Sequence, residues 1–226
     1  MAKNKLQRYE EVRELDTVLE YTEFAEGGRT PPAGDWNDRI FEDPGPVVLE
    51  LACGKGEYTL QLARTSPEIN AVGIDIKGAR IWKGATRAHR EGLKNVRFLR
   101  IFIDHLVDYF APGEVSQIWI PFPDPYLKET KSDKRLTSPK FLEIYQKVLE
   151  PGGTIHLKTD SPELWEYTLE VIRNERCELL DRVDDIYKER PGDELLTHTT
   201  YYERKHLAAG RTIRYVRFRL PDVKEA

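Results

Sequence analysis

The chain has 226 residues, of which 39% are hydrophobic and 33% are charged. This length suits one α/β domain with short additions, and the composition excludes general disorder. The net charge of −4 excludes a uniformly basic protein that wraps nucleic acid, and two cysteines are too few for a disulfide scaffold. No apolar run reaches the roughly 20 residues of a membrane-spanning helix. The N-terminus has no signal-peptide pattern, so we expect a cytoplasmic protein.

The first predicted element is an amphipathic helix. Apolar residues at spacings of three and four, from Leu6 to Leu19, predict it over residues 5–24. Glycines and prolines between residues 27 and 34 then predict a loop. We therefore expect residues 1–45 to form an N-terminal extension of helix and loop, and residues 46–226 to form a single domain.

After this extension, predicted strands and helices alternate. Apolar runs predict strands over residues 47–53, 71–76, 96–101, 115–120 and 154–159, and two later ones over 177–183 and 212–220. Helices predicted over residues 57–64, 78–91, 139–149 and 162–173 lie between them. Parallel strands need such crossovers, so the pattern predicts an α/β fold with a mainly parallel seven-stranded sheet and helices on both faces. Ligands bind such sheets at the carboxyl ends of the strands.

The first predicted strand ends in a glycine-rich turn, Glu-Leu-Ala-Cys-Gly-Lys-Gly-Glu over residues 50–57. Gly54 and Gly56 let the backbone turn tightly and approach a ligand, although such a turn can also be purely structural. A dinucleotide fingerprint needs a small residue where this chain has Thr59, and the carboxylates of Glu50 and Glu57 repel a pyrophosphate. Both acids instead suit the cationic amino-acid part of S-adenosylmethionine, and Glu50 disfavours a nicotinamide oxidoreductase.

Two more acids follow the next two predicted strands. Asp75 can accept from ribose hydroxyls and Asp104 from an adenine amine, and each can alternatively cap the helix after it. Together with Glu50 they predict an adenosine site. The fourth strand leads into Pro-Phe-Pro-Asp-Pro-Tyr-Leu-Lys over residues 121–128, where three prolines stiffen the loop that carries Asp124. An Asp-Pro turn by itself needs no function.

Four motifs together resemble the bacterial tRNA (guanine-N7)-methyltransferase family: the glycine turn, the loop over residues 122–136, Gly153 followed by Thr159-Asp160, and the run Thr-Tyr-Tyr-Glu over residues 200–203. The resemblance extends from about Val47 to Phe218, with Ala52 where a glycine is usual and Tyr126 where a tryptophan is usual. It implies a class I S-adenosylmethionine-dependent methyltransferase domain with a Rossmann-like fold over residues 46–226. The implied substrate is the variable-loop guanine at position 46 of tRNA, methylated at N7. We expect no membrane partner, and a monomer or homodimer.

The resemblance also implies roles for single residues. Those of the S-adenosylmethionine site would be Glu50, Gly54, Gly56, Asp75, Asp104 and Asp124, of which Asp124 is the catalytic one, where the methyl is transferred. Those that meet the RNA would be Lys128, Asp160, Thr200, Tyr201, Tyr202 and Glu203. Guanine N7 carries a free lone pair, so the enzyme mainly aligns the reactants, and Asp124 and Asp160 can accept from the guanine N1–H and amino group.

Alternatives remain open at two motifs and for the function. Asp160 can favour the dipole of the helix after it, with Ser161 as N-cap, and Thr200 and Glu203 have the spacing of a capping box. A small-molecule methyltransferase shares the glycine turn but gives no role to residues 200–203. A non-catalytic RNA-binding module leaves the acids at the strand ends without a role.

The net charge hides three basic segments. Residues 77–100 carry eight Lys and Arg against one Glu, residues 128–140 carry five against two acids, and residues 201–219 carry six against one. Spacings of three and four in the first segment predict a basic stripe on one helical face, which is either solvated or follows the tRNA backbone. Its residues are Lys77, Arg80, Lys83, Arg87, Arg90 and Lys94. The histidines and cysteines have no metal-ligand spacing, so we expect no metal site.

Overall fold

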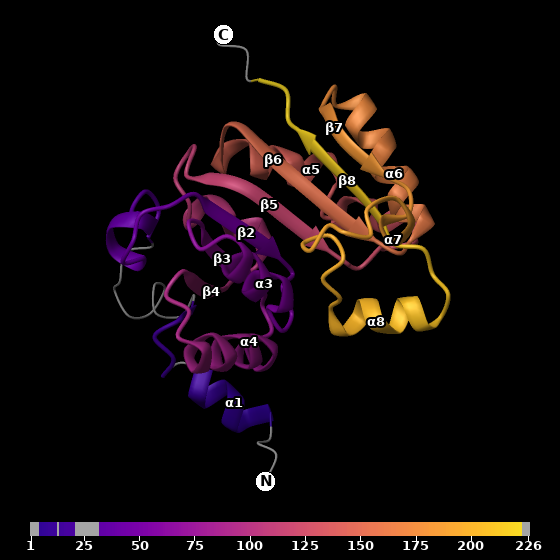
Figure 1. Cartoon of the computed structure of the whole chain (residues 1–226). Coiled ribbons are helices and arrows are strands. Elements are labelled where there is room, and N and C mark those ends of the chain that lie inside the picture. Colours follow the sequence, from indigo (N-terminus) through magenta and orange to yellow (C-terminus); the bar gives the residue numbers. More distant parts are fainter. Residues whose placement is uncertain (1–4, 13, 21–31, 223–226) are drawn as a thin grey trace.

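Eight strands form one sheet in the computed structural model, which describes residues 5–12, 14–20 and 32–222 (Figure 1). The strands lie in the order β1-β4-β3-β2-β5-β6-β8-β7, and neighbours are parallel except that β8 runs antiparallel to β6 and β7. The mainly parallel α/β sheet is therefore confirmed, with eight strands instead of the expected seven. The strand bounds are β1 (Val18–Glu20), β2 (Val47–Leu51), β3 (Asn70–Ile74), β4 (Val96–Arg100), β5 (Val115–Pro121), β6 (Leu149–Thr159), β7 (Glu178–Val183) and β8 (Arg214–Arg219).

Helices cover both faces of the sheet. Apolar side chains of α3 (Glu57–Thr65) and α4 (Gly78–Glu91) pack on one face, and those of α5 (Pro139–Val148) and α6 (Pro162–Asn174) pack on the other. Alternation along β2 separates the two layers, because Leu49 and Leu51 join the core under α5 and α6 whereas Glu50 faces α3. Helix α1 (Lys5–Val12) packs against α4, as Figure 1 shows.

The remaining helical segments are short and follow the ends of strands or the loops between them. They are η1 (Trp36–Ile40), η2 (Ile103–Asp108), η3 (Glu129–Lys134), α7 (Ile186–Glu189) and α8 (Tyr201–Ala208). In the described part of the chain, no helix has the length and apolar character needed to span a bilayer.

The expected helix over residues 5–24 is wrong in its second half. The helix ends at Val12, and β1 (Val18–Glu20) pairs with β4 and forms the edge of the sheet. The side chain of Glu20 is fully buried and forms an ion pair with Arg100, at 2.8 Å between Oε2 and Nη1. Pairing with a distant strand therefore overrides the local spacing of apolar residues and supplies the eighth strand. Residues 21–24 of the predicted helix lie outside the described residues.

The glycine turn after β2 is held close to α4 by the ring of Phe98. A Cβ atom at Gly56 would lie 2.3 Å from this ring, and one at Gly84 in α4 would lie 2.6 Å from the carbonyl oxygen of Lys55. Both positions therefore need glycine for the turn and the helix to pack on each other. Gly56, which also has a φ of +63°, is thus explained by packing beneath the turn.

Candidate active site

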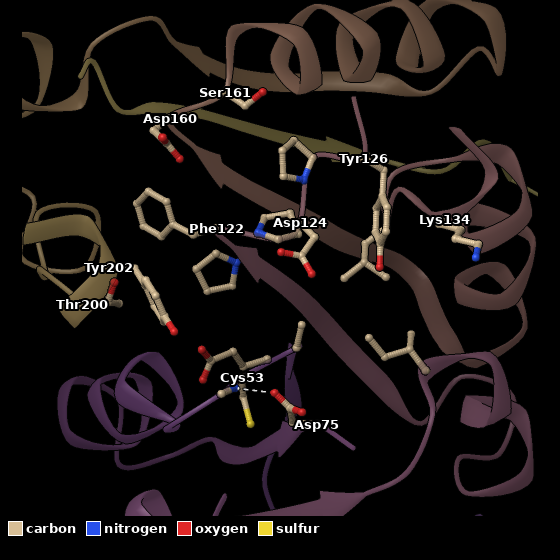
Figure 2. A pocket seen from close by; sticks show the side chains of 18 of the residues that line it. Cys53, Asp75, Phe122, Asp124, Tyr126, Lys134, Asp160, Ser161, Thr200 and Tyr202 are labelled. Carbon is tan, nitrogen blue, oxygen red and sulfur yellow. Dashed lines mark hydrogen bonds between the residues drawn. The ribbon is translucent and has the colours of Figure 1, made fainter. Parts of the chain in front are cut away.

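A cleft of about 1310 Å³ opens at the carboxyl edge of the sheet. The turn after β2, the segments after β3, β4 and β5, and the first turns of α6 and α8 line it (Figure 2). It brings together eight of the twelve predicted site residues: Glu50, Gly54, Asp75, Asp104, Asp124, Asp160, Thr200 and Tyr202. Its lining does not include the other four: Gly56, Lys128, Tyr201 and Glu203.

Glu50 forms the floor of the cleft beside the glycine turn. Its side chain is 4% exposed, and Oε2 accepts hydrogen bonds from the backbone N–H of Thr59, at 2.6 Å, and from the Thr59 hydroxyl. Burial, with a smaller contribution from the nearby charges of Glu57 and Asp75, raises the pKa of the Glu50 carboxyl from 4.5 to about 8. A cation bound in the cleft would stabilise the ionised form of this group.

Asp75 joins the end of β3 to the glycine turn. Its Oδ2 accepts from the backbone N–H of Gly54 at 2.9 Å, and its Oδ1 accepts from that of Lys77 at 2.8 Å. The expected alternative, in which Asp75 caps the following helix, is wrong because Lys77 occupies the N-cap of α4. Each carboxylate oxygen keeps one lone pair free for a ligand.

Asp104 lies across the cleft in the first turn of η2. The N-cap of this segment is Phe102 rather than Asp104, so helix capping does not explain the acid. About half of the Asp104 side chain is exposed, and its carboxylate forms an ion pair with Lys140. Phe102 beside it is 60% exposed, which leaves an apolar ring at the rim of the cleft.

Asp124 has no hydrogen-bond or ion-pair partner among the described residues, and its exposed carboxylate lies in the middle of the cleft (Figure 2). The loop around it is strained, since Phe122 and Tyr126 have positive φ angles of 52° and 42°. The guanidinium of Arg135 donates to the carbonyl oxygen of Tyr126 at 3.1 Å through Nη2, and Nε lies 3.3 Å from that of Pro125. The loop therefore presents a rigid, unneutralised acid.

Arg135 is a residue that the sequence analysis missed. Its side chain is 5% exposed and its guanidinium lies 4.2 Å from the ring centre of Tyr167 in α6. No local pattern distinguishes it from the other cations of the basic segment over residues 128–140. Its role depends on the fold, which brings its guanidinium next to the carbonyl oxygens of the Pro-rich loop.

Asp160 lies in the cleft as expected, but its charge is already compensated. Its Oδ2 lies 2.5 Å from Nη1 of Arg211 and 3.1 Å from Nδ1 of His206. The neighbouring Ser161 caps α6 by accepting from the backbone N–H of Leu164 at 3.2 Å. Arg211 and His206 also line the cleft, and the sequence indicated them only as members of a basic segment.

The motif over residues 200–203 forms the capping box that was one of its two interpretations. Thr200 caps α8 by accepting from the backbone N–H of Glu203, and the Glu203 carboxylate accepts from the backbone N–H of Thr200. The Glu203 side chain is fully buried and forms an ion pair with Lys158, at 2.8 Å between Oε1 and Nζ. The expectation that Glu203 meets RNA is thus not supported by its position, because direct contact needs an exposed side chain.

The two tyrosines of this motif point to different places. Tyr202 is 46% exposed and lies in the cleft near Thr200 (Figure 2). Tyr201 is 37% exposed and lies outside the cleft lining, where the ammonium groups of Lys55 and Lys205 lie 3.8 and 4.6 Å from its ring centre. Hydrogen bonding to Lys205 and the charges of Lys205, Lys55 and Lys83 lower the pKa of the Tyr201 hydroxyl.

The described residues provide no set of ligands for a metal ion. Over residues 5–12, 14–20 and 32–222, no group of three or more His, Cys, Asp or Glu side chains is placed to hold a metal ion. Cys53 and Cys177 are both free, and burial raises the pKa of both thiols. The chemical capacity of the cleft therefore lies in its carboxylates, its cations and its aromatic rings.

Comparison with known proteins identifies the family. Residues 44–216 match a family model described as a putative methyltransferase. The tRNA (guanine-N(7)-)-methyltransferase of Christiangramia forsetii is 44% identical over 221 residues, which cover 97% of this chain and 99% of that protein. The crystal structure of the 16S rRNA methyltransferase KamB shares the fold, with a TM-score of 0.60 and 18% identity over 78% of this chain and 88% of that chain. So does the 16S rRNA (adenine(1408)-N(1))-methyltransferase of Catenulisporales acidiphilia with cosubstrate SAM, with a TM-score of 0.57 and 14% identity over 100% of this chain and 95% of that chain. The chain belongs to the tRNA (guanine-N(7)-)-methyltransferase family.

Proposed function

We propose that this protein transfers a methyl group from S-adenosylmethionine to N7 of a guanine in tRNA. The observation that carries the proposal is the convergence of Glu50, Asp75 and the unpartnered Asp124 on one cleft at the carboxyl edge of the sheet. The name of the C. forsetii relative supports the acceptor. Three finer points belong to the same proposal: the variable-loop guanine at position 46 as target, residues 46–226 as one methyltransferase domain, and a cytoplasmic monomer or homodimer.

The cleft fits the donor on three counts. A Cβ at Gly54 would meet no atom closer than the Ala52 carbonyl oxygen at 4.0 Å, so the backbone here is open to a ligand. The free lone pairs of Asp75 suit two ribose hydroxyls. Asp104 and the exposed ring of Phe102 offer a carboxylate and an apolar surface to an adenine. When bound, S-adenosylmethionine supplies a methyl group on a positively charged sulfur, and Glu50 and Asp124 are the acids that favour this charge.

Asp124 is the catalytic residue of the proposal. In the transfer, the guanine N7 lone pair would bond to the methyl carbon as the carbon–sulfur bond breaks and its electron pair stays on the sulfur as a neutral thioether, so no proton is lost and the protein needs no general base. The carboxylate of Asp124 can accept from the N1–H and amino group of the guanine and offset the positive charge that passes to the base. Its rigid loop contributes to alignment, a factor that is worth up to about 7–11 kcal/mol in favourable systems.

Asp160 takes a different part. Because Arg211 already balances its charge, we assign it to positioning the RNA, through the side chains of Arg211 and His206 that it holds at the rim of the cleft. Thr200 and Tyr202 line the cleft and belong to the same proposed RNA-binding surface. The buried Glu203 positions both by capping the N-terminus of α8.

Transfer of labelled methyl groups to bulk tRNA tests the proposal. The purified protein, labelled S-adenosylmethionine and unmodified tRNA should give labelled tRNA that is cleaved chemically at N7-methylguanine in the variable loop. A parallel reaction replaces the tRNA with a pool of metabolites. Label in the metabolites alone would contradict the proposal and favour a small-molecule methyltransferase, and no label in either would favour a binding module.

The variant Asp124→Asn tests the assignment of the catalytic residue. We expect kcat to fall by about 100-fold or more, with the Kd for S-adenosylmethionine changed much less. Asp160→Asn should also reduce turnover more than folding. The matched control is Asp184→Asn, since Asp184 is an exposed acid paired with Arg182 outside the cleft lining. Full activity of both Asp124→Asn and Asp160→Asn would refute these roles.

A further inference from the structure

The basic stripe on α4 is divided into two halves of different character. All six of its cations are exposed, as a solvated face or an RNA contact would require. In the distal half, Nε of Arg87 lies 2.8 Å from Glu91, and Nζ of Lys94 lies 2.6 Å from Glu42. In the half near the cleft, no carboxylate of the described residues pairs with Lys77, Arg80 or Lys83. Two of the three cations of the distal half are therefore paired, Arg87 with a carboxylate that it shares with Arg64, whereas none of the three near the cleft is paired with a carboxylate of the described residues.

The free half is continuous with the cleft. Lys77 and Arg80 line it directly, at the end where α4 begins. Lys83, one turn further, lies close enough to Tyr201 for its charge to act on the hydroxyl, as Lys55 and Lys205 also do. The resulting arc of positive charge around the cleft mouth is called the basic rim here, and it consists of Lys77, Arg80, Lys83, Lys55 and Lys205.

Aromatic side chains indicate which anion suits the basic rim. Two of its ammonium groups lie against the ring of Tyr201, and the exposed Tyr202, which lies in the cleft, contacts Tyr201 with ring centres 5.4 Å apart. Proteins that bind unpaired RNA combine cations for the phosphates with aromatic rings on which bases stack. Because Lys55 and Lys205 already lie against the ring of Tyr201, the exposed ring of Tyr202 is the surface that a base can stack on, and a small anion or a lipid headgroup offers no flat ring to it. The charge and the rings together favour an RNA strand.

We propose that the basic rim binds the phosphates of the RNA strand next to the target guanine, and that the distal half of the stripe does not bind RNA. The proposal rests on the proposed function and deepens it, because it states where the tRNA backbone leaves the cleft. The strand runs from the cleft mouth along the first two turns of α4, past Tyr201 and Lys205. The alternative, a solvated face, predicts that both halves of the stripe behave alike.

Two matched triple variants test the basic rim. One is Lys77→Gln, Arg80→Gln, Lys83→Gln, and the control is Arg87→Gln, Arg90→Gln, Lys94→Gln. Both remove three cations from the same exposed face, so they change the net charge equally. Binding of unmodified tRNA is measured over a range of salt concentrations, and thermal unfolding and the Kd for S-adenosylmethionine are measured for each variant.

Release of counterions sets the expected size of the effect. Loss of three phosphate contacts should make the slope of log K against log salt less steep by about 2.1 to 2.7. Between 50 and 200 mM salt, the wild-type affinity would then fall about 20- to 40-fold further than that of the rim variant. The control variant should keep a slope close to that of the wild type.

Equal salt slopes for the two triple variants, or a larger change of slope in the control variant, would overturn the inference about the basic rim. The proposed function would still stand in that case, provided that the wild-type protein methylates tRNA. A wild-type protein that neither methylates nor binds tRNA would overturn both. A rim variant with a wild-type slope but weaker binding of S-adenosylmethionine would also overturn it, since the cations would then serve the donor.

Discussion

The buried ion pair between Lys158 and Glu203 connects the two sides of the cleft. Lys158 is 1% exposed and Glu203 is fully buried, with Nζ 2.8 Å from Oε1. The carboxylate also accepts from the hydroxyl of Tyr187 at 2.9 Å, and it completes the capping box with Thr200. The carbonyl of Lys158 accepts from the backbone N–H of Phe122 at 2.8 Å, at the start of the Pro-rich loop that carries Asp124. Disruption of this ion pair should therefore destabilise both the N-terminus of α8 and the loop that carries Asp124.

Replacement of one partner leaves a buried charge without compensation. Burial already lowers the pKa of the Lys158 ammonium, and Glu203 is the group that opposes this shift. We expect Glu203→Gln and Lys158→Met each to lower the free energy of unfolding by about 3–5 kcal/mol. This is a large part of the roughly 5–15 kcal/mol that stabilises a typical domain. The double variant has no buried charge left, so its loss should be smaller than the sum of the two single losses by at least about 2 kcal/mol.

Urea denaturation of the wild type, both single variants and the double variant measures this coupling. The exposed pair Arg182 and Asp184 provides a control cycle, because its side chains are about half exposed and such pairs contribute less than about 1 kcal/mol. Single losses that simply add, within about 0.5 kcal/mol, would refute the coupling. The double variant should also recover part of the tRNA methylation that Glu203→Gln loses, since the uncompensated ammonium of Lys158 beside α8 is then gone.

Three further changes test other parts of the cleft. Burial raises the pKa of the Glu50 carboxyl to about 8, so this group stays protonated in the folded chain at pH values where the unfolded chain, with a pKa of 4.5, has lost the proton. The free energy of unfolding of the wild type therefore falls as the pH rises from 4.5 to about 8. Between pH 6 and 8, Glu50→Gln should therefore gain about 2–3 kcal/mol relative to the wild type in urea denaturation, and a constant difference would contradict this. Arg135→Lys should lower kcat for tRNA methylation about 10- to 100-fold at an unchanged KM for S-adenosylmethionine. The reason is that an ammonium cannot replace the guanidinium that holds the carbonyl groups of Pro125 and Tyr126. Unchanged turnover would argue against this positioning role. Ala52→Gly should raise Tm by about 2 °C, since Ala52 has a φ of 54° that costs an alanine about 1 kcal/mol, and a lower Tm would show that this strain is absent.

Local patterns predicted most of the elements. The helix predicted over residues 78–91 has the same bounds as α4, because its cations and apolar residues alternate at the helical period and Gly92 ends it with a φ of +67°. The strand predicted over residues 47–53 ends at Leu51, where the glycine turn begins. Once these alternating elements are known, the position of a cleft at the carboxyl ends of the strands follows from the topology of parallel sheets.

Partners that are distant in the sequence could not be predicted in this way. The strand β1 exists because it pairs with β4, about eighty residues later, and its own spacing of apolar residues resembles a helix. Arg135 is equally hidden, since its function depends on carbonyl groups of a loop that precedes it by ten residues and on the ring of Tyr167. Local periodicity contains no information about such contacts.

Charge compensation is the part of the site that depends most on the fold. Asp124 and Asp160 look equivalent in the sequence, because each follows a strand and precedes a proline within two residues. In the folded chain, Arg211 arrives from a segment 51 residues later and balances Asp160, whereas no described residue balances Asp124. An acid that is already paired gains little when positive charge develops nearby, and an unpaired acid held in a rigid loop gains the full interaction. On the assignment that we propose, the difference between the catalytic Asp124 and the positioning Asp160 is therefore set by where Arg211 lies.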